Sequence, residues 1–157
     1  MGWVLAMPQS SQLGSPNTFI WDDAARAQEE IAAHYENLRE RYPMDPQRVI
    51  LAGFSQGAGL AIRICLRGLI PARGFLAVVP GRIATEDLDE AIRSARGKRG
   101  YLVVGDRDPR YETSAQIHAL LNRNGIPCEM EDHPEMGHEF PRNFDQSILS
   151  AMRFLMA

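Results

Sequence analysis

Short apolar runs alternate with longer amphipathic stretches along almost the whole chain, and this alternation restricts the fold more than any other feature. The apolar runs have the length of buried strands. The stretches between them carry apolar residues at spacings of three and four, which is typical of helices that cover a sheet. A regular strand–helix order requires parallel strands. We therefore predict an α/β fold with a mostly parallel sheet and helices on both faces.

The pattern predicts five strands and five helices. The strands are expected at residues 3–8, 48–54, 74–80, 100–106 and 127–134. The helices are expected from Asp22 or Asp23 to about residue 42, and at 56–68, 86–95, 111–124 with Gly125 as C-cap, and 143–156. The polar segment 9–19 is rich in turn formers. The first helix is expected to bury one stripe, formed by Ala24, Ala27, Ile31, His34, Tyr35 and Leu38.

A length of 157 residues suits a single domain over 1–157. The net charge of −3 argues against nucleic acid or an anionic membrane surface as a partner. No apolar run approaches the ~20 residues that span a bilayer, and no signal-peptide pattern is present, so a soluble cytoplasmic protein is expected. Cys65 and Cys128 form neither a disulfide framework nor a metal pattern, and both are expected to be reduced and structural.

The segment from Gly53 to Gly57 fits the pattern G-x-S-x-G where a predicted strand becomes a helix. This context predicts a strained turn that exposes the hydroxyl of Ser55 at the carboxyl edge of the sheet. Side chains at Gly53 and Gly57 are expected to collide with neighbouring backbone. The backbone N–H of Gln56 is expected to point to the oxyanion position. The alternative is a glycine-rich turn with an incidental serine.

A serine hydroxyl is a weak nucleophile until a base takes its proton, so a histidine is required. His138 lies in the loop after the last predicted strand, at the edge that also holds the serine, and is the favoured base. His133, late in that strand, is the alternative. His34 and His118 lie in amphipathic helices and are expected to be ordinary face residues.

The base needs a carboxylate to orient it, and Asp106 and Asp108 both follow the strand 100–106. Either carboxylate could accept the Nδ1–H of His138 and stabilise the imidazolium. Both could instead be turn residues before Pro109. Serine, then aspartate, then histidine is the order in which one particular fold arranges this triad.

Several motifs carry a resemblance to the phospholipase/carboxylesterase family of the α/β-hydrolase superfamily, which includes acyl-protein thioesterases. They are GFSQGA (53–58), GDRDP (105–109), GHEFP (137–141), PQS (8–10) and WDD (21–23). The resemblance covers essentially the whole chain. It implies a three-layer α/β-hydrolase-type fold and places the acid of the triad on Asp108, the fourth position of a G-x-x-D pattern.

Members of that family are longer at the N-terminus. The resemblance therefore implies that the front strands, and an HG-type loop that supplies the second oxyanion N–H, are absent here. Strands 3–8 and 48–54 would then have unpaired edges, since another strand lies between them in the full fold. The first strand could shift to pair with the second, a partner chain such as a second copy could complete the sheet, or the chain could be part of a longer protein. Losing one oxyanion donor costs about 10²–10³ in turnover, so activity would be reduced unless another N–H substitutes.

The expected function is a serine carboxylesterase that hydrolyses small or accessible carboxylic esters, or thioesters, through an acyl-enzyme. Ser55, Asp108 and His138 form the expected triad, and the mechanism requires no metal or organic cofactor. Candidate substrate contacts are Ser10, Leu13, Phe19 and Trp21, in a segment that could equally be a solvated loop. Two alternatives are a catalytically impaired binding or assembly module and a serine hydrolase that acts on peptide bonds.

Overall fold

The computed structural model describes residues 3–157, with the backbone alone for Thr85 and Glu86. The chain separates into two compact units, one up to Pro43 and the other from Met44 to Ala157. A single domain over 1–157 therefore stays a prediction.

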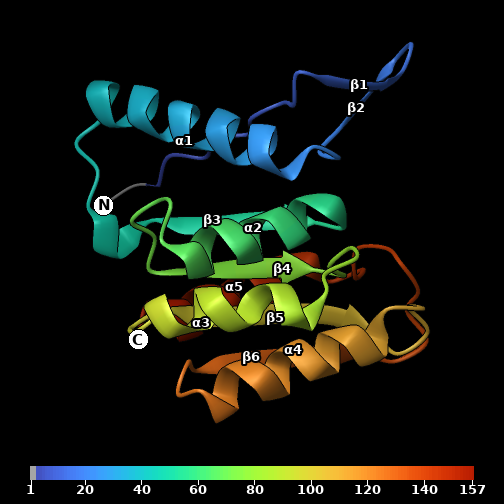
Figure 1. Cartoon of the computed structure of the whole chain (residues 1–157). Helices are drawn as coiled ribbons and strands as arrows, with labels where there is room; N and C mark the ends of the chain where they lie inside the picture. The colour runs from blue at the N-terminus through green and yellow to red at the C-terminus, as the bar shows by residue number, and fades with distance from the viewer. Residues whose placement is uncertain (1–2) are drawn as a thin grey trace. The chain divides into compact units, whose positions relative to one another are not determined.

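A four-stranded parallel sheet forms the centre of the second unit (Figure 1). Its strands are β3 (Ile50–Phe54), β4 (Gly74–Val78), β5 (Arg99–Gly105) and β6 (Cys128–His133), in the spatial order β3-β4-β5-β6. The parallel pairing that the alternation predicted is confirmed along all three interfaces. Because the strands are parallel, their carboxyl ends and the connections that follow them share one edge.

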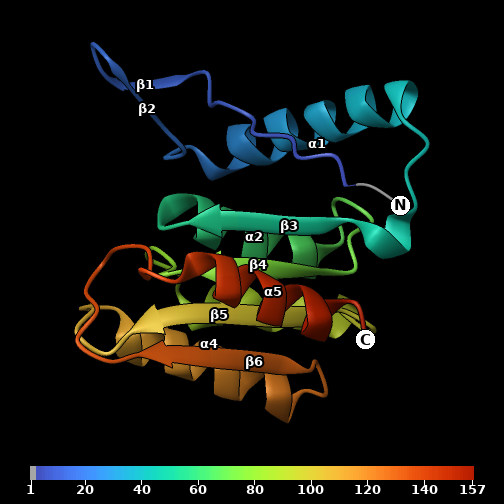
Figure 2. The same cartoon turned by 180° about the vertical axis from the view of Figure 1, so that it is seen from behind.

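Helices cover both faces of this sheet, as predicted. The helices α2 (Gln56–Arg67), α3 (Asp89–Ser94) and α4 (Tyr111–Arg123) lie on one face, and α5 (Phe144–Leu155) lies on the other (Figures 1 and 2). Each face has its own apolar core. The core under α2 to α4 includes Ile62, Phe75 and Leu102, and the core under α5 includes Val103 and Leu155.

Most element boundaries agree with the sequence to within two residues. The strand expected from residue 48 begins at Ile50, because a 3₁₀ turn at Pro46–Arg48, capped by the carboxylate of Asp45, precedes it. A second 3₁₀ turn, Thr85–Leu88, precedes α3. The C-cap of α4 is Asn124, one residue earlier than predicted; Gly125 follows it with a φ of 75°, a conformation that favours glycine.

The first unit contains the helix α1 (Ala24–Arg41) and a small antiparallel hairpin of β1 (Gln12–Ser15) and β2 (Thr18–Ile20). The Asp23 carboxylate accepts the backbone N–H of Arg26 and caps α1, as expected. The hairpin was not predicted, because its short strands carry no apolar alternation. Of the expected stripe, Ala27 and Tyr35 are buried, whereas His34 is exposed.

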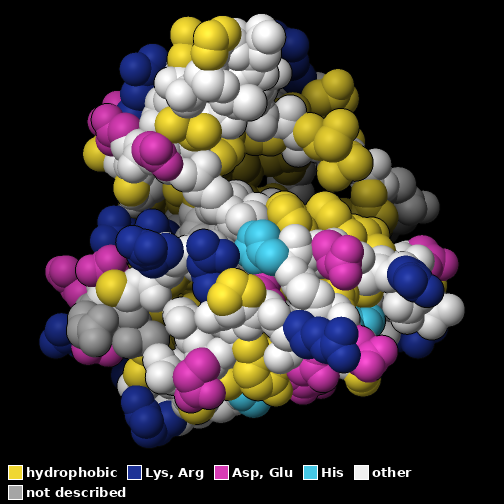
Figure 3. Space-filling model, turned by 90° about the vertical axis from the view of Figure 1, so that its right-hand side faces the viewer, with side chains coloured by type: hydrophobic (Ala, Val, Ile, Leu, Met, Phe, Trp, Pro, Cys, Tyr) yellow, Lys and Arg dark blue, Asp and Glu magenta, His cyan; other side chains and the backbone are white. Residues whose placement is uncertain are grey.

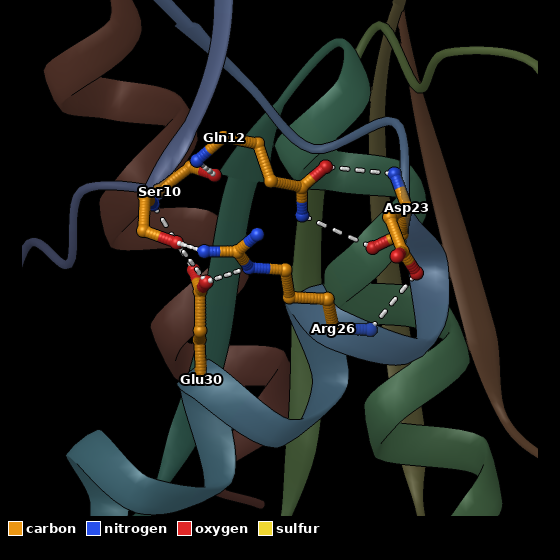
Figure 4. A network of polar contacts seen from close by, with 6 residues as sticks. Ser10, Gln12, Asp23, Arg26 and Glu30 are labelled. Atoms are coloured by element: carbon orange, nitrogen blue, oxygen red, sulfur yellow. Dashed lines mark hydrogen bonds and ion pairs between the residues drawn. The ribbon is translucent and has the colours of Figure 1, made fainter.

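Polar contacts connect the hairpin to the first turns of α1 (Figure 4). The Gln12 amide donates to the carbonyl of Asp23 at 3.1 Å and accepts the Asp23 N–H at 2.7 Å. The guanidinium of Arg26 donates to Ser11 and to Glu30, which also accepts from Ser11. Burial in the first unit is sparse, so these contacts hold the hairpin against the helix.

The prediction of a strand at residues 3–8 is wrong, because the structure has no strand there. Leu5 and Met7 are 82% and 83% exposed. An extended segment becomes a strand only when a neighbouring strand pairs with it, and none of the described strands pairs with this segment. Direct pairing of residues 3–8 with β3 is thus not found. Completion by a partner chain, or by a longer parent protein, stays a prediction.

No helix within residues 3–157 has the length and apolar character needed to cross a bilayer. The same residues contain no group of three or more His, Cys, Asp or Glu side chains arranged to hold a metal ion.

Both cysteine thiols are free and buried, and burial raises the pKa of Cys65 to about 11 and of Cys128 to about 12. The thiolate is the reactive form, so we expect neither thiol to react with an aromatic disulfide reagent at pH 8 in the folded protein. In guanidinium chloride both should react within minutes, as absorbance will report. Rapid labelling of either thiol in the native protein would contradict the burial described here.

Candidate active site

Ser55 occupies a strained turn between β3 and α2. Its φ of 51° and ψ of −115° lie in a region that residues with a side chain rarely adopt. The turn is held by two backbone hydrogen bonds: the N–H of Ser55 donates to the carbonyl of Val78 at 3.0 Å, and the N–H of Gly81 donates to the carbonyl of Ser55 at 2.7 Å. The last residue of β4 and the connection that follows it therefore hold the backbone of Ser55 in place.

The two glycines of the G-x-S-x-G pattern have different roles. A Cβ atom at Gly53 would lie 2.3 Å from the carbonyl carbon and oxygen of Gly57, so only glycine fits there. The same expectation for Gly57 is wrong, because among the described residues nothing lies within 4 Å of the Cβ it would carry. Gly57 lies in the first turn of α2, where the helix moves away from the strand.

A continuous hydrogen-bonded chain connects Ser55, His138 and Asp108. The distance from Ser55 Oγ to His138 Nε2 is 2.7 Å, and the distance from His138 Nδ1 to Asp108 Oδ2 is also 2.7 Å. A carboxylate can only accept, so Nδ1–H donates to Asp108 and leaves Nε2 to accept the serine proton. The imidazole is in the tautomer that a general base requires.

The carboxylate of Asp108 is nearly fully buried and both its oxygens are used. Oδ2 accepts from His138, and Oδ1 accepts the backbone N–H of Arg110 at 2.8 Å. Asp106, the other candidate, instead accepts the backbone N–H of Glu135 at 2.7 Å. The structure thus gives the two aspartates separate partners: one orients the histidine, and the other fixes the loop that carries it.

The loop that carries His138 approaches the end of β5 unusually closely. A Cβ atom at Gly105 would lie 2.1 Å from the carbonyl oxygen of Met136. The backbone N–H of Arg107 donates to this same oxygen at 3.0 Å. This contact places His138 beside Asp108. Gly105 is not among the residues predicted from the sequence, although a glycine directly after an apolar run indicates a close backbone approach.

Backbone strain is concentrated around this site. Within residues 3–157, three non-glycine residues have a positive φ, namely Ser55 at 51°, Val79 at 37° and Glu135 at 62°, and each follows the carboxyl end of a strand. Val79 is β-branched and buried, which makes its conformation especially unfavourable. Such residues cost about 1–3 kcal/mol each and cluster at functional sites. Sequence patterns gave no signal for Val79 or Glu135.

Aromatic rings surround one side of the histidine. The ring centroid of Phe54 lies 5.5 Å from that of His138 and 4.4 Å from that of Phe140, which stacks on it. The ring centroid of Phe144 lies 4.9 Å from that of Phe140. Phe140 is 48% exposed, so an apolar surface lies open to solvent next to the imidazole.

The alternative base, His133, lies in a different cluster under α5. Its Nε2 is 2.7 Å from Glu131 Oε1, and Glu131 also accepts hydrogen bonds from Tyr101 and Ser147. Burial, followed by the hydrogen bond to Glu131, raises the pKa of Tyr101. The structure therefore does not place His133 with Ser55. His118 lies half-buried on α4.

The four candidate substrate contacts belong to the first unit, and their role stays a prediction. The Ser10 hydroxyl is buried and accepts the backbone N–H of Gln12 at 3.0 Å. Leu13 and Phe19 are partners in the hairpin, 68% and 49% exposed. Trp21 is half-buried.

Comparisons with known proteins identify a family and a shared fold. A family model described as phospholipase/carboxylesterase matches residues 18–156. The structure superimposes on that of an uncharacterised protein from Bacillus cereus ATCC 10987 with a TM-score of 0.90 and 31% identity, covering 97% of this chain and 50% of that one. Esterase PE8 gives a TM-score of 0.72 at 25% identity, covering 83% and 60% of the two chains.

A Bacillus cereus carboxylesterase has a TM-score of 0.70 at 15% identity, covering 94% of this chain and 73% of that one, and shows a shared fold. The chain spans only 50% and 60% of the lengths of the first two structures. No curated protein matches the chain significantly.

The unequal surroundings of the two glycines lead to a direct test. We expect Gly53→Ala to lower the free energy of unfolding by about 1–3 kcal/mol, because the new methyl group displaces backbone. We expect Gly57→Ala to be neutral or to stabilise by up to about 1 kcal/mol, because alanine favours the helix. Urea denaturation of both variants measures this difference, and equal destabilisation would contradict the described turn.

Proposed function

Because the chain belongs to the phospholipase/carboxylesterase family, we propose that it is a serine carboxylesterase that hydrolyses small or accessible carboxylic esters. The observation that carries this proposal is the hydrogen-bonded chain from Ser55 Oγ through His138 to Asp108, with both distances at 2.7 Å. A serine in a strained strand–helix turn, a base within reach of its proton and a buried carboxylate behind the base are the parts that acyl transfer requires.

In the first half of the reaction, Ser55 Oγ attacks the ester carbonyl carbon as His138 Nε2 takes the hydroxyl proton. The carboxylate of Asp108 holds the imidazole in place and stabilises the imidazolium that forms. Collapse of the tetrahedral intermediate breaks the bond to the alcohol oxygen, and His138 returns the proton to that leaving group. The acyl group then remains on Ser55 as an ester.

In the second half, water takes the place of the alcohol. His138 Nε2 accepts a proton from the water as its oxygen attacks the acyl carbon, and the same imidazolium then returns the proton to Ser55 Oγ. The products are the carboxylic acid and the regenerated serine. A thioester reacts by the same steps with a thiol as the leaving group.

The oxyanion that forms during attack needs hydrogen-bond donors, and the backbone N–H of Gln56 is the proposed one. Gln56 is the first residue of α2, where the N–H groups carry the positive end of the helix dipole. A Cβ atom at Gly81 would lie 3.2 Å from the Gln56 nitrogen, so the absence of a side chain there leaves space beside this donor. With a single donor, we expect turnover about 10²–10³ below that of an enzyme with two.

The exposure of the site favours accessible substrates. The side chain of His138 is 29% exposed, and the exposed ring of Phe140 stacks on Phe54 beside it. An acyl chain could pack on this aromatic surface while the carbonyl reaches the serine.

Hydrolysis of p-nitrophenyl acetate and butyrate tests the proposal. We expect Ser55→Ala to lower kcat/KM by about 10³ or more, since the nucleophile is removed. Asp108→Asn should lower it by up to about 10⁴, since an asparagine no longer fixes the tautomer of His138. Release of nitrophenolate is followed by absorbance.

Ser94→Ala is the matched control, because Ser94 is an exposed serine at the end of α3. It should retain the rate of the unaltered protein. Equal rates for Ser55→Ala and the unaltered protein would refute the proposal and favour a binding module. Faster turnover of a peptide panel than of the esters would instead favour a peptide hydrolase.

A further inference from the structure

Two arginines line a shallow pocket in the second unit. The pocket has a volume of about 290 Å³ and is lined by Arg82, Ile83, Pro109, Arg110 and Thr113. Arg82 is exposed and Arg110 is half-buried. Neither guanidinium forms a hydrogen bond or an ion pair with any other residue between 3 and 157 whose side chain is described. Among the side chains that the structure describes, no carboxylate thus pairs with either of the two positive charges at this pocket.

The backbone on both sides of this pocket is tied to the Ser–His–Asp chain. Gly81, the residue before Arg82, donates its N–H to the carbonyl of Ser55 at 2.7 Å. On the other side, the backbone N–H of Arg110 donates to Asp108 Oδ1 at 2.8 Å. Each arginine is therefore within one residue of a backbone group that contacts the site, and the pocket lies next to the proposed position of the ester.

The charged residues that line this pocket are both arginines and favour an anion; Glu112, in the first turn of α4, does not line it. Arg110 is the N-cap of α4 and Thr113 lies in its first turn, so the positive end of the helix dipole is at the pocket. The side chain of Asp108 is 3% exposed, and both oxygens of its carboxylate already accept hydrogen bonds. On the side of the molecule toward which β4 and β5 point, basic side chains gather beside a histidine (Figure 3).

We propose that the pocket formed by Arg82, Arg110 and the first turn of α4 binds a carboxylate carried by the ester substrate. This inference rests on the proposed esterase function and narrows its substrate class from esters in general to esters with a second, anionic end. A guanidinium matches the planar carboxylate through paired N–H donors, and two of them can hold the group from both sides.

Binding of the carboxylate next to the reacting carbonyl raises kcat/KM for an anionic ester over its neutral counterpart. A charge-assisted hydrogen bond contributes about tenfold in affinity, so loss of both arginines should cost about 100-fold for an anionic substrate. The pocket is open to solvent, so salt should weaken the preference.

The test compares two matched pairs of esters, because the carboxylate can be on the acyl or the alcohol side. The first pair is monoethyl adipate and ethyl hexanoate, and the second is 4-acetoxybenzoate and its methyl ester. The variants are Arg82→Gln, Arg110→Gln and the double variant, with Arg123→Gln, an exposed arginine at the far end of α4, as control. We expect the double variant to lose about 100-fold in kcat/KM on the anionic member of at least one pair and less than about twofold on its neutral member.

The neutral ester reports folding and catalysis in each variant, so a change confined to the anionic ester isolates the pocket. Equal changes within both pairs, or no change in either, would overturn the inference while leaving the esterase proposal intact.

Calorimetric titration with adipate gives a readout that does not depend on turnover. Adipate binding that the double variant loses and Arg123→Gln retains would support the pocket even if no ester were hydrolysed. Equal adipate binding by the unaltered protein and the double variant would overturn it.

Discussion

The parallel alignment of β3 to β6 is the constraint on which the rest of the structure depends. Because all four strands run the same way, the connections that follow them meet at one edge of the sheet. Ser55 follows β3, Asp108 follows β5 and His138 follows β6, so residues up to 83 positions apart come within 2.7 Å of one another. The connection after β4 supplies Gly81, which supports the serine turn, and Arg82, which faces the adjoining pocket.

Close backbone contacts convert this general convergence into a defined geometry. Gly53 and Gly105 each allow an approach that a Cβ atom would prevent. The strained conformations of Ser55, Val79 and Glu135 persist because the core on both sides of the sheet holds the strand ends in place. The free energy stored at this edge is thus offset by apolar burial elsewhere, and the hydroxyl, imidazole and carboxylate are aligned before any substrate binds.

The sequence predicted the parts of the molecule that follow from periodicity. The parallel sheet and its helices could be read from apolar runs, because burial imposes that periodicity. Short motifs at the strand ends placed Ser55 and His138 at one edge, whereas the choice of Asp108 over Asp106 came from the family resemblance. Contacts between segments that are far apart in the sequence leave no such periodic pattern. Residues 3–8 are as apolar as a buried strand but pair with none of the described strands, and the hairpin at 12–20 forms without an apolar pattern. The strain at Val79, the close approach at Gly105 and the shared pocket of Arg82 and Arg110 likewise depend on which segments become neighbours.

We propose that the imidazole at position 138 makes the hydroxyl at position 55 nucleophilic. A fluorophosphonate measures this most directly, because the serine oxygen displaces fluoride and the phosphonyl group stays on the protein, where intact mass and peptide mapping locate it. We expect one phosphonyl group per chain, on Ser55, formed far more slowly in His138→Ala. A protein that stays unlabelled under these conditions, or that reacts equally fast without the imidazole, would contradict it.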